Sequence, residues 1–460
     1  MTPTLNRTLI ALALVALASP LAANEREDED GRHTAPASAD QAAPRPEDPD
    51  GPPAASDQPA DDAGAETAPA DVPTGDTPPA NDETAREETG DTGTPPDDTG
   101  APAAPDPVAP LELLGKTVPV GTFDTLYWTP DQSFRSIATP VPVLVAHGTR
   151  PGPHLCLTAA VHGDELNGIE MVRRLMYELE PDELAGTVVG VPIVNLDGFR
   201  NGSRYLSDRR DLNRYFPGRK NGSAASRVAW SLFENIVRHC DYLVDLHTGS
   251  QKRVNQPQLR ADLENPQVVA FAKHFGGMTV LHSPSSSGML RAAAVDEGIV
   301  AVTMEAGGPN RLEDDAVDYG VQALETLLEN LDMRKASRFW GAPQPVFYES
   351  EWIRASQGGI LLSEVELNEQ VKKGQILGTV TDPISNTGSA IIAPYDGRVL
   401  GMAVNQVVHA GFAAYRIGEE KSAEEVEAKA EQAQERSAPE AGGDESKPAE
   451  EPDRPDGDTE

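Results

Sequence analysis

A buried strand that runs directly into a helix is the feature of this sequence that most restricts its fold. Residues 155–161 read Leu-Cys-Leu-Thr-Ala-Ala-Val, an apolar run typical of a strand covered on both faces. From residue 166 onward, apolar side chains recur every three or four positions, which indicates a helix. Strand and helix signals keep alternating to about residue 333. They predict an α/β fold with a mostly parallel, mixed sheet and helices on both faces.

Residues 111–340 form this predicted domain. Its strands are expected at 141–147, 155–161, 187–195, 242–247 and 299–304, and its helices after Glu165 and over 224–239, 265–275, 289–297 and 316–333. Residues 344–418 have a different pattern, with short strands between Gly, Asn-Glu, Lys-Gly and Asp-Gly turns. They predict a small all-β domain of the barrel-sandwich kind.

The two ends of the chain hold most of its net charge of −36. Residues 1–23 combine Arg7, a short apolar core and small residues, the pattern of a signal peptide that leaves no transmembrane anchor after cleavage. Residues 24–110 contain 23 acidic and 4 basic residues and no aromatic one, and residues 419–460 are similarly acidic. Both are expected to be disordered, except that residues 421–436, where Ala alternates with Glu and Lys, could extend a helix for a few turns. The chain is therefore predicted to be exported, to the periplasm or the medium, and its acidity argues against nucleic-acid binding.

Cys156 and Cys240 are the only cysteines. Neither belongs to a Cys-x-x-Cys motif, so a zinc site built on thiolates is excluded. They could pair if their Cα atoms lay within roughly 7 Å, which the sequence leaves open.

Three side chains at strand ends suggest a metal site. His162 and Glu165 follow the strand at 155–161, and His247 ends the strand at 242–247. Carboxyl ends of neighbouring strands are where open α/β sheets place their sites. Two imidazoles and one carboxylate are the ligands of a catalytic zinc that keeps one position for water. We therefore predict one Zn²⁺ per chain.

Two carboxylates near these ligands suggest supporting roles. Glu305 ends an apolar strand just before Gly307 and Gly308, and it is the candidate general base; the alternative is an ion pair with an arginine. Asp245 leaves the same strand face as His247 and could orient it, or it could pair with an arginine.

The loop at 195–218 is rich in arginine. A guanidinium group binds a carboxylate through two parallel hydrogen bonds, so the loop is expected to hold a carboxylate-bearing substrate. The alternative is that Asp208 and Asp211 pair with these arginines.

Five motifs together resemble the succinylglutamate desuccinylase/aspartoacylase family of the zinc carboxypeptidase clan. They are His162-Gly-Asp-Glu165, Asn195-Leu-Asp-Gly198, Asp211-Leu-Asn-Arg214-Tyr-Phe-Pro-Gly218, Asp245-Leu-His247-Thr-Gly249 and Met304-Glu305-Ala-Gly-Gly308. The resemblance implies zinc on His162, Glu165 and His247, with Glu305 as base and proton shuttle. It also implies that Asn213 and Arg214 bind the substrate carboxylate and that Arg204 polarises the scissile carbonyl.

Residues 344–418 resemble the lipoyl/biotinyl-like β-sandwich of some members. The hairpin at 381–388 has no lysine for cofactor attachment, so shielding of the active site or homo-oligomerisation is the expected use. The predicted export and the acidic spacer set this chain apart from cytoplasmic members.

The leading functional hypothesis is a zinc hydrolase that cleaves the amide bond of an N-acyl amino acid. One alternative is a carboxypeptidase acting on peptides or cell-wall peptide stems. Another is a metal-binding scaffold without catalysis. In the first two cases the partner is a small carboxylate-bearing substrate.

Overall fold

The computed structural model describes residues 108–130, 139–250, 252–335 and 346–437. The predicted signal peptide and nearly all of the acidic spacer lie outside these residues. Within them, no helix combines the length and the apolar character needed to cross a membrane.

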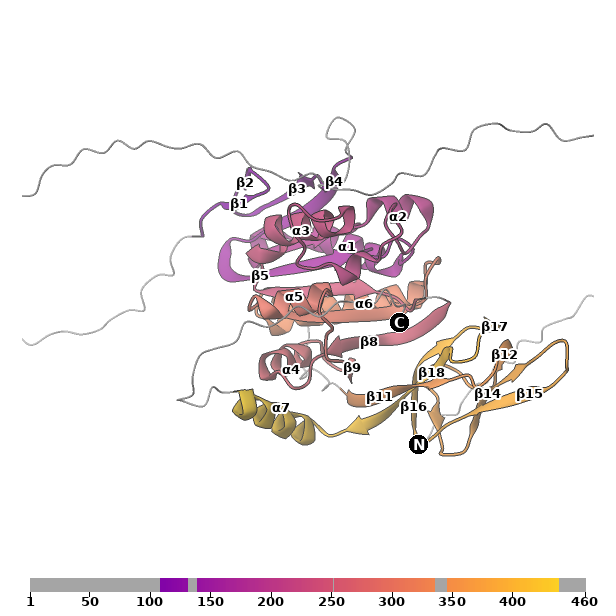
Figure 1. Cartoon of the computed structure of the whole chain (residues 1–460). Coiled ribbons are helices and arrows are strands. Elements are labelled where there is room, and N and C mark those ends of the chain that lie inside the picture. The colour runs from indigo at the N-terminus through magenta and orange to yellow at the C-terminus, as the bar shows by residue number, and fades with distance from the viewer. Residues whose placement is uncertain (1–107, 131–138, 251, 336–345, 438–460) are drawn as a thin grey trace, which may run out of the picture. The chain divides into compact units, whose positions relative to one another are not determined.

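Strands and helices alternate along the first part of the described chain, and strands prevail in the second (Figure 1). They are β1 (Leu111–Leu113), β2 (Lys116–Val118), β3 (Thr122–Trp128), β4 (Val141–His147), β5 (Arg150–Ala159), β6 (Ala185–Val191), β7 (Tyr242–His247), β8 (Arg253–Ala261), β9 (Thr279–His282), β10 (Val300–Gly307), β11 (Val346–Arg354), β12 (Gly359–Ser363), β13 (Gln370–Val371), β14 (Ile376–Thr381), β15 (Gly388–Ile392), β16 (Gly397–Ala403), β17 (Gln406–Val408) and β18 (Ala413–Lys421).

The helices lie mainly between the strands of the first part. They are α1 (Asn167–Glu178), α2 (Leu196–Asn201), α3 (Ala224–Asn235), α4 (Pro266–Lys273), α5 (Leu290–Asp296), α6 (Asp314–Asn330) and α7 (Ala423–Ser437), with short 3₁₀ turns η2 (Pro181–Glu183), η3 (Leu212–Arg214) and η4 (Val237–His239).

The main sheet has the strand order β13-β16-β18-β11-β9-β8-β10-β7-β5-β6-β4-β3. Strands β10, β7, β5 and β6 run parallel at its centre, whereas β4 and β8 flank them in the antiparallel direction. The predicted mixed sheet is thus confirmed. Strand β8 was not predicted, because its sequence, Arg-Val-Asn-Gln-Pro-Gln-Leu-Arg-Ala, is too polar to resemble a buried strand.

Helices cover both faces of the central strands, as predicted. On one face α1, α4 and α6 pack against side chains such as Leu157, Val244 and Val302. On the other face α3 and α5 pack against Cys156, Leu243 and their neighbours. Successive residues of β5 and β7 therefore enter opposite cores, which explains why these strands are apolar throughout.

The C-terminal strands form a β-sandwich that shares the main sheet. Strands β11, β13, β16 and β18 continue the main sheet, and β15-β14-β12-β17 form a second sheet. Side chains between the two layers, among them Leu361, Val380 and Tyr415, make a core of their own. The predicted all-β region is present, but β9–β11 and β8–β16 pairing joins it to the α/β part without a break.

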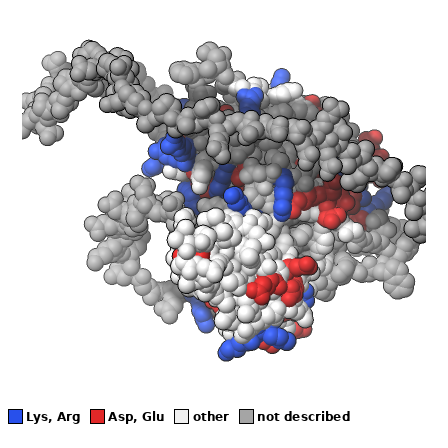
Figure 2. All heavy atoms as spheres, turned by 90° about the vertical axis from the view of Figure 1, so that its right-hand side faces the viewer, with Lys and Arg blue, Asp and Glu red and all other residues white. Residues whose placement is uncertain are grey.

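The outward face of the four-stranded sheet is apolar as well. Figure 2 shows this side of the molecule, where a largely white surface carries separate acidic and basic patches. Its exposed large hydrophobic residues include Ile360, Leu362, Ile376, Ile392 and Val407.

The prediction of a disordered tail from residue 419 is wrong for residues 419–437, whereas the helix expected within residues 421–436 is present. Strand β18 continues to Lys421, and α7 follows. Val426 and Ala430 of α7 are buried in the core on the side of α4, because they recur at helical spacing within an otherwise charged sequence. The remainder of the predicted tail lies outside the described residues.

Cys156 and Cys240 form a disulfide, which settles the question that the sequence left open. Their Cα atoms lie 5.9 Å apart. Cys156 belongs to β5, and Cys240 precedes β7, its parallel neighbour. The bond therefore links the two strands that lead to the predicted metal ligands.

We expect a Cys156→Ala/Cys240→Ala double variant to lose about 2–4 kcal/mol of unfolding free energy, because the cross-link closes a long chain segment in the unfolded state. Denaturant titration of wild type and variant would measure the difference. A loss smaller than about 0.5 kcal/mol, at the level of ordinary surface substitutions, would contradict the expectation.

Candidate active site

The turn after β5 places the side chains of His162 and Glu165 at the edge of the sheet. Ala160 has a positive φ of 47° and redirects the chain directly after the strand. A Cβ on Gly163 would lie 2.0 Å from the backbone of Gly198 at the start of α2, so only glycine fits there. His162 and Glu165 lie on this turn, before α1 begins at Asn167.

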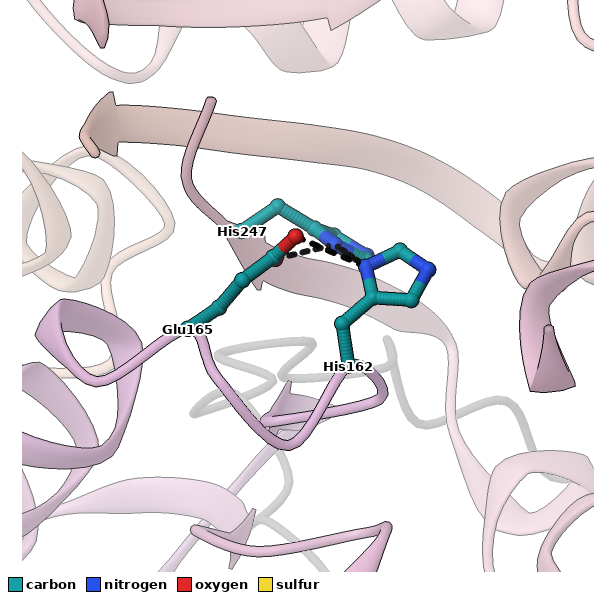
Figure 3. A group of neighbouring side chains, drawn as sticks. All are labelled: His162, Glu165 and His247. Atoms are coloured by element: carbon teal, nitrogen blue, oxygen red, sulfur yellow. Dashed lines mark hydrogen bonds and ion pairs between the residues drawn. The ribbon is translucent and has the colours of Figure 1, made fainter. Parts of the chain in front are cut away.

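The structure places His162, Glu165 and His247 side by side, with one ligand atom of each within 4.8 Å of the others (Figure 3). Glu165 Oε1 lies 2.9 Å from His162 Nδ1, and its Oε2 lies 2.8 Å from His247 Nδ1. The two Nδ1 atoms are 3.1 Å apart. All three residues are buried.

Each histidine contacts a second carboxylate through its other ring nitrogen. His247 Nε2 lies 2.7 Å from Asp245, and His162 Nε2 lies 3.1 Å from Asp211. A carboxylate can only accept, so it favours a proton on Nε2 and leaves the Nδ1 lone pair for a metal. The sequence suggested this contact for Asp245, but it gave Asp211 no such role.

The electrostatics of this cluster favour a cation. Burial disfavours a charged His247, yet Asp245 and Glu165 raise its pKa well above the usual value. Burial likewise opposes the ionised form of Glu165, but His162 and His247 hold the pKa of that carboxyl well below its usual range. Two imidazoles and a carboxylate in such surroundings fit a divalent cation such as zinc.

Glu305 lies next to His247, because β10 and β7 pair in parallel with these two residues in register. The side chain is buried and has two neighbours: Asn255 donates a hydrogen bond of 2.9 Å to Oε2, and Arg260 Nε lies 3.2 Å from Oε1. The arginine ion pair that the sequence left as an alternative is therefore present. Glu305 nevertheless lines the same pocket as the ligand cluster.

Of the four arginines within residues 200–210, Arg204 is the one that lines the pocket. Its guanidinium donates to Asp211 at 2.9 Å and to Glu165 at 3.2 Å. Arg210 instead pairs with Asp208 at 2.9 Å. The alternative given for the loop is thus present, because Asp211 pairs with Arg204 and Asp208 pairs with Arg210. Binding of a substrate carboxylate by the loop stays a prediction.

Asn213 and Arg214 also line the pocket, on the turn η3. Asn213 Oδ1 accepts a hydrogen bond from the backbone of Leu290 at 2.8 Å, which fixes the orientation of the side chain. Arg214 donates to the backbone oxygen of Asn213 at 2.9 Å.

The pocket has walls that the sequence did not predict. Arg253, Asn255 and Arg260 come from the unpredicted strand β8, and Trp352 and Ala413 come from the C-terminal strands β11 and β18. Arg253 lies over the Trp352 ring, 5.1 Å from its centroid, and donates to the backbone oxygen of Ala413 at 2.9 Å. The β-sandwich therefore closes one side of the pocket.

Comparison with known proteins gives a match to one catalytic-domain family over part of the chain and a shared fold. Residues 151–331 match the succinylglutamate desuccinylase/aspartoacylase catalytic domain. An N-alpha-acetyl-L-2,4-diaminobutyric acid deacetylase from Halomonas elongata is 24% identical over 244 residues, which cover 50% of this chain and 71% of that protein.

Two solved structures share the fold. A succinylglutamate desuccinylase/aspartoacylase from Rhodobacter sphaeroides has a TM-score of 0.59 at 22% identity, covering 65% of this chain and 95% of its own. The product-bound ectoine utilization protein EutE (DoeB) from Ruegeria pomeroyi has the same TM-score and identity, covering 65% of this chain and 97% of its own.

We expect Asp211→Asn and Asp245→Asn each to weaken zinc binding about 10–100-fold, because the paired histidine loses its orienting carboxylate. Competition with a chromogenic chelator would measure the affinity. Asp208→Asn, in the same loop but paired with Arg210, is the matched control and should bind zinc like wild type. Wild-type affinity in both test variants would show that the two carboxylates do not support the ligands.

Proposed function

We propose that the chain is a zinc-dependent deacylase, since residues 151–331 match the succinylglutamate desuccinylase/aspartoacylase catalytic domain. It would hydrolyse the amide bond of an N-acyl amino acid or a similar carboxylate-bearing molecule. The observation that carries the proposal is the convergence of His162, Glu165 and His247 beside Glu305 in one pocket.

A zinc ion held by His162, Glu165 and His247 would lower the pKa of water and would place positive charge beside the carbonyl oxygen. Glu305 would take the proton from the attacking water and deliver it to the leaving nitrogen. Arg204 would hold the carbonyl oxygen as negative charge develops on it.

Asn213 and Arg214 would hold the substrate carboxylate and thereby place the amide bond next to Glu305. Trp352 and Ala413 stand on the wall contributed by the C-terminal strands. This wall limits how far a substrate can extend, which favours an acylated amino acid over a peptide stem. The Halomonas relative makes N-alpha-acetyl-L-2,4-diaminobutyrate the first compound to test.

Export stays a prediction from residues 1–23. The disulfide between Cys156 and Cys240 is compatible with it, because such bonds persist in oxidising compartments.

We expect zinc-loaded wild-type protein to release amino acid from at least one N-acyl amino acid in a panel that also contains peptides with free carboxyl ends. Mass spectrometry of the products would separate the two substrate classes. Cleavage of the peptides alone would favour a carboxypeptidase. No turnover of either class would favour the scaffold hypothesis.

We expect Glu305→Gln to lower kcat by about 10²–10⁴-fold, because the amide cannot accept the proton from water. The zinc content should stay at one per chain, measured by elemental analysis. Glu364→Gln, at an exposed position directly after β12, is the matched control and should keep wild-type turnover. Undiminished kcat in Glu305→Gln would reject the role of Glu305 as base.

A further inference from the structure

Asn255 is a buried polar residue in direct contact with Glu305. It lies on β8 with 2% of its surface exposed, and its Nδ2 donates a hydrogen bond of 2.9 Å to Glu305 Oε2. Arg260, also on β8, approaches the other carboxylate oxygen at 3.2 Å. Both oxygens of Glu305 therefore have a neighbour from the same strand.

An irregularity in strand pairing allows this contact. Glu305 pairs with Gln258 and Gly307 pairs with Asn255, and the register shifts between these two pairs. Two steps along β10 thus correspond to three steps along β8. Such bulges change the direction of a side chain and occur often beside active sites. Here the irregularity lies at the position where the Asn255 amide contacts Glu305.

The opposite side of Asn255 faces the C-terminal region. Strand β16 pairs with β8, and Gly401 is the partner of Asn255. A Cβ on Gly401 would lie 2.5 Å from Asn255 Oδ1. That oxygen is buried and has no hydrogen-bond partner among the described residues.

A buried oxygen without a partner costs free energy, so it calls for an explanation. The contact with Glu305 provides one. The NH₂ group of Asn255 points to the Glu305 carboxylate, so the amide oxygen points to Gly401. Only glycine, which has no side chain, leaves room for that oxygen.

We propose that Asn255 is a positioning residue for Glu305, and that Gly401 of the C-terminal β-sandwich keeps Asn255 in place. The inference rests on the proposed function, in which Glu305 is the base. It gives the β-sandwich a part in catalysis that differs from shielding the pocket, because β16 supports the side chain that orients the base.

The physical reason is geometric. A glutamate carboxylate can rotate about its last bond, and a displacement of about 1 Å at a reacting group can cost about 10²-fold in rate. The hydrogen bond from Asn255 restricts this rotation. Because the amide is neutral, it holds Glu305 without adding a second positive charge next to Arg260, which would make the carboxylate a weaker base.

We expect Asn255→Leu and Asn255→Ala to lower kcat about 10–100-fold, while KM and zinc content stay at wild-type values. The leucine is close to asparagine in size and shape and removes the donor without placing a charge beside Glu305, so it tests the hydrogen bond even if the alanine variant folds poorly. Steady-state kinetics with elemental analysis would provide the numbers.

The support from β16 is tested by Gly401→Val, which should lower kcat in the same way without touching the pocket. The double variant Asn255→Ala/Gly401→Val should be no slower than Asn255→Ala alone, because Gly401 acts through Asn255. Gly388→Val is the matched control and should keep wild-type kcat, since a Cβ there has its nearest neighbour at 3.4 Å and Asn255 is not near it.

The outcomes separate this inference from the proposed function. Wild-type kcat in both Asn255 variants, with Glu305→Gln inactive, would overturn the role of Asn255 and leave the base assignment intact. A fully active Glu305→Gln would overturn both. Rate losses of Asn255→Ala and Gly401→Val that multiply in the double variant would overturn the coupling through Gly401.

Discussion

The parallel pairing of β5, β7 and β10 is the constraint on which the site depends. In this register Ala159 lies beside Leu246, and His247 lies beside Glu305. The turn carrying His162 and Glu165 therefore emerges next to the end of β7. A slip of one residue between strands would turn His247 to the other face of the sheet, away from the cluster. The disulfide between Cys156 and Cys240 links two of these three strands near the opposite end.

The position of the candidate ligands could be predicted from the sequence because a strong local signal marks the strand ends. Apolar strands that end in His, Glu or Gly motifs can be read from the chain, and the three ligand candidates and Glu305 were predicted in this way. Strand β8 gave no such signal, because its buried residues are polar: Asn255, Gln256 and Gln258 are all buried. Their burial depends on partners far along the sequence. For the same reason Asp211 could be placed in a motif but not assigned to His162.

The C-terminal region shows how a domain predicted as separate can become part of a site. The turns and short strands of this region could be predicted from the sequence. Its pairing with the α/β part could not, because β16–β8 and β11–β9 pairs join segments that are far apart in the chain. Through this attachment Trp352 and Ala413 reach the pocket, and Gly401 reaches Asn255. Backbone pairing positions these residues more firmly than a flexible linker between two domains could.

The charges around the pocket also favour a carboxylate-bearing substrate. Four carboxylates lie in or beside the cluster, those of Glu165, Asp211, Asp245 and Glu305, and Arg204 and Arg260 contact three of them. One divalent cation together with these two arginines would balance four negative charges. Arg214 and Arg253 also line the pocket and bring two further guanidinium groups to its wall. In a chain with a net charge of −36, guanidinium groups gathered beside the candidate metal ligands would help to hold an anionic substrate at the place where the proposed reaction requires it.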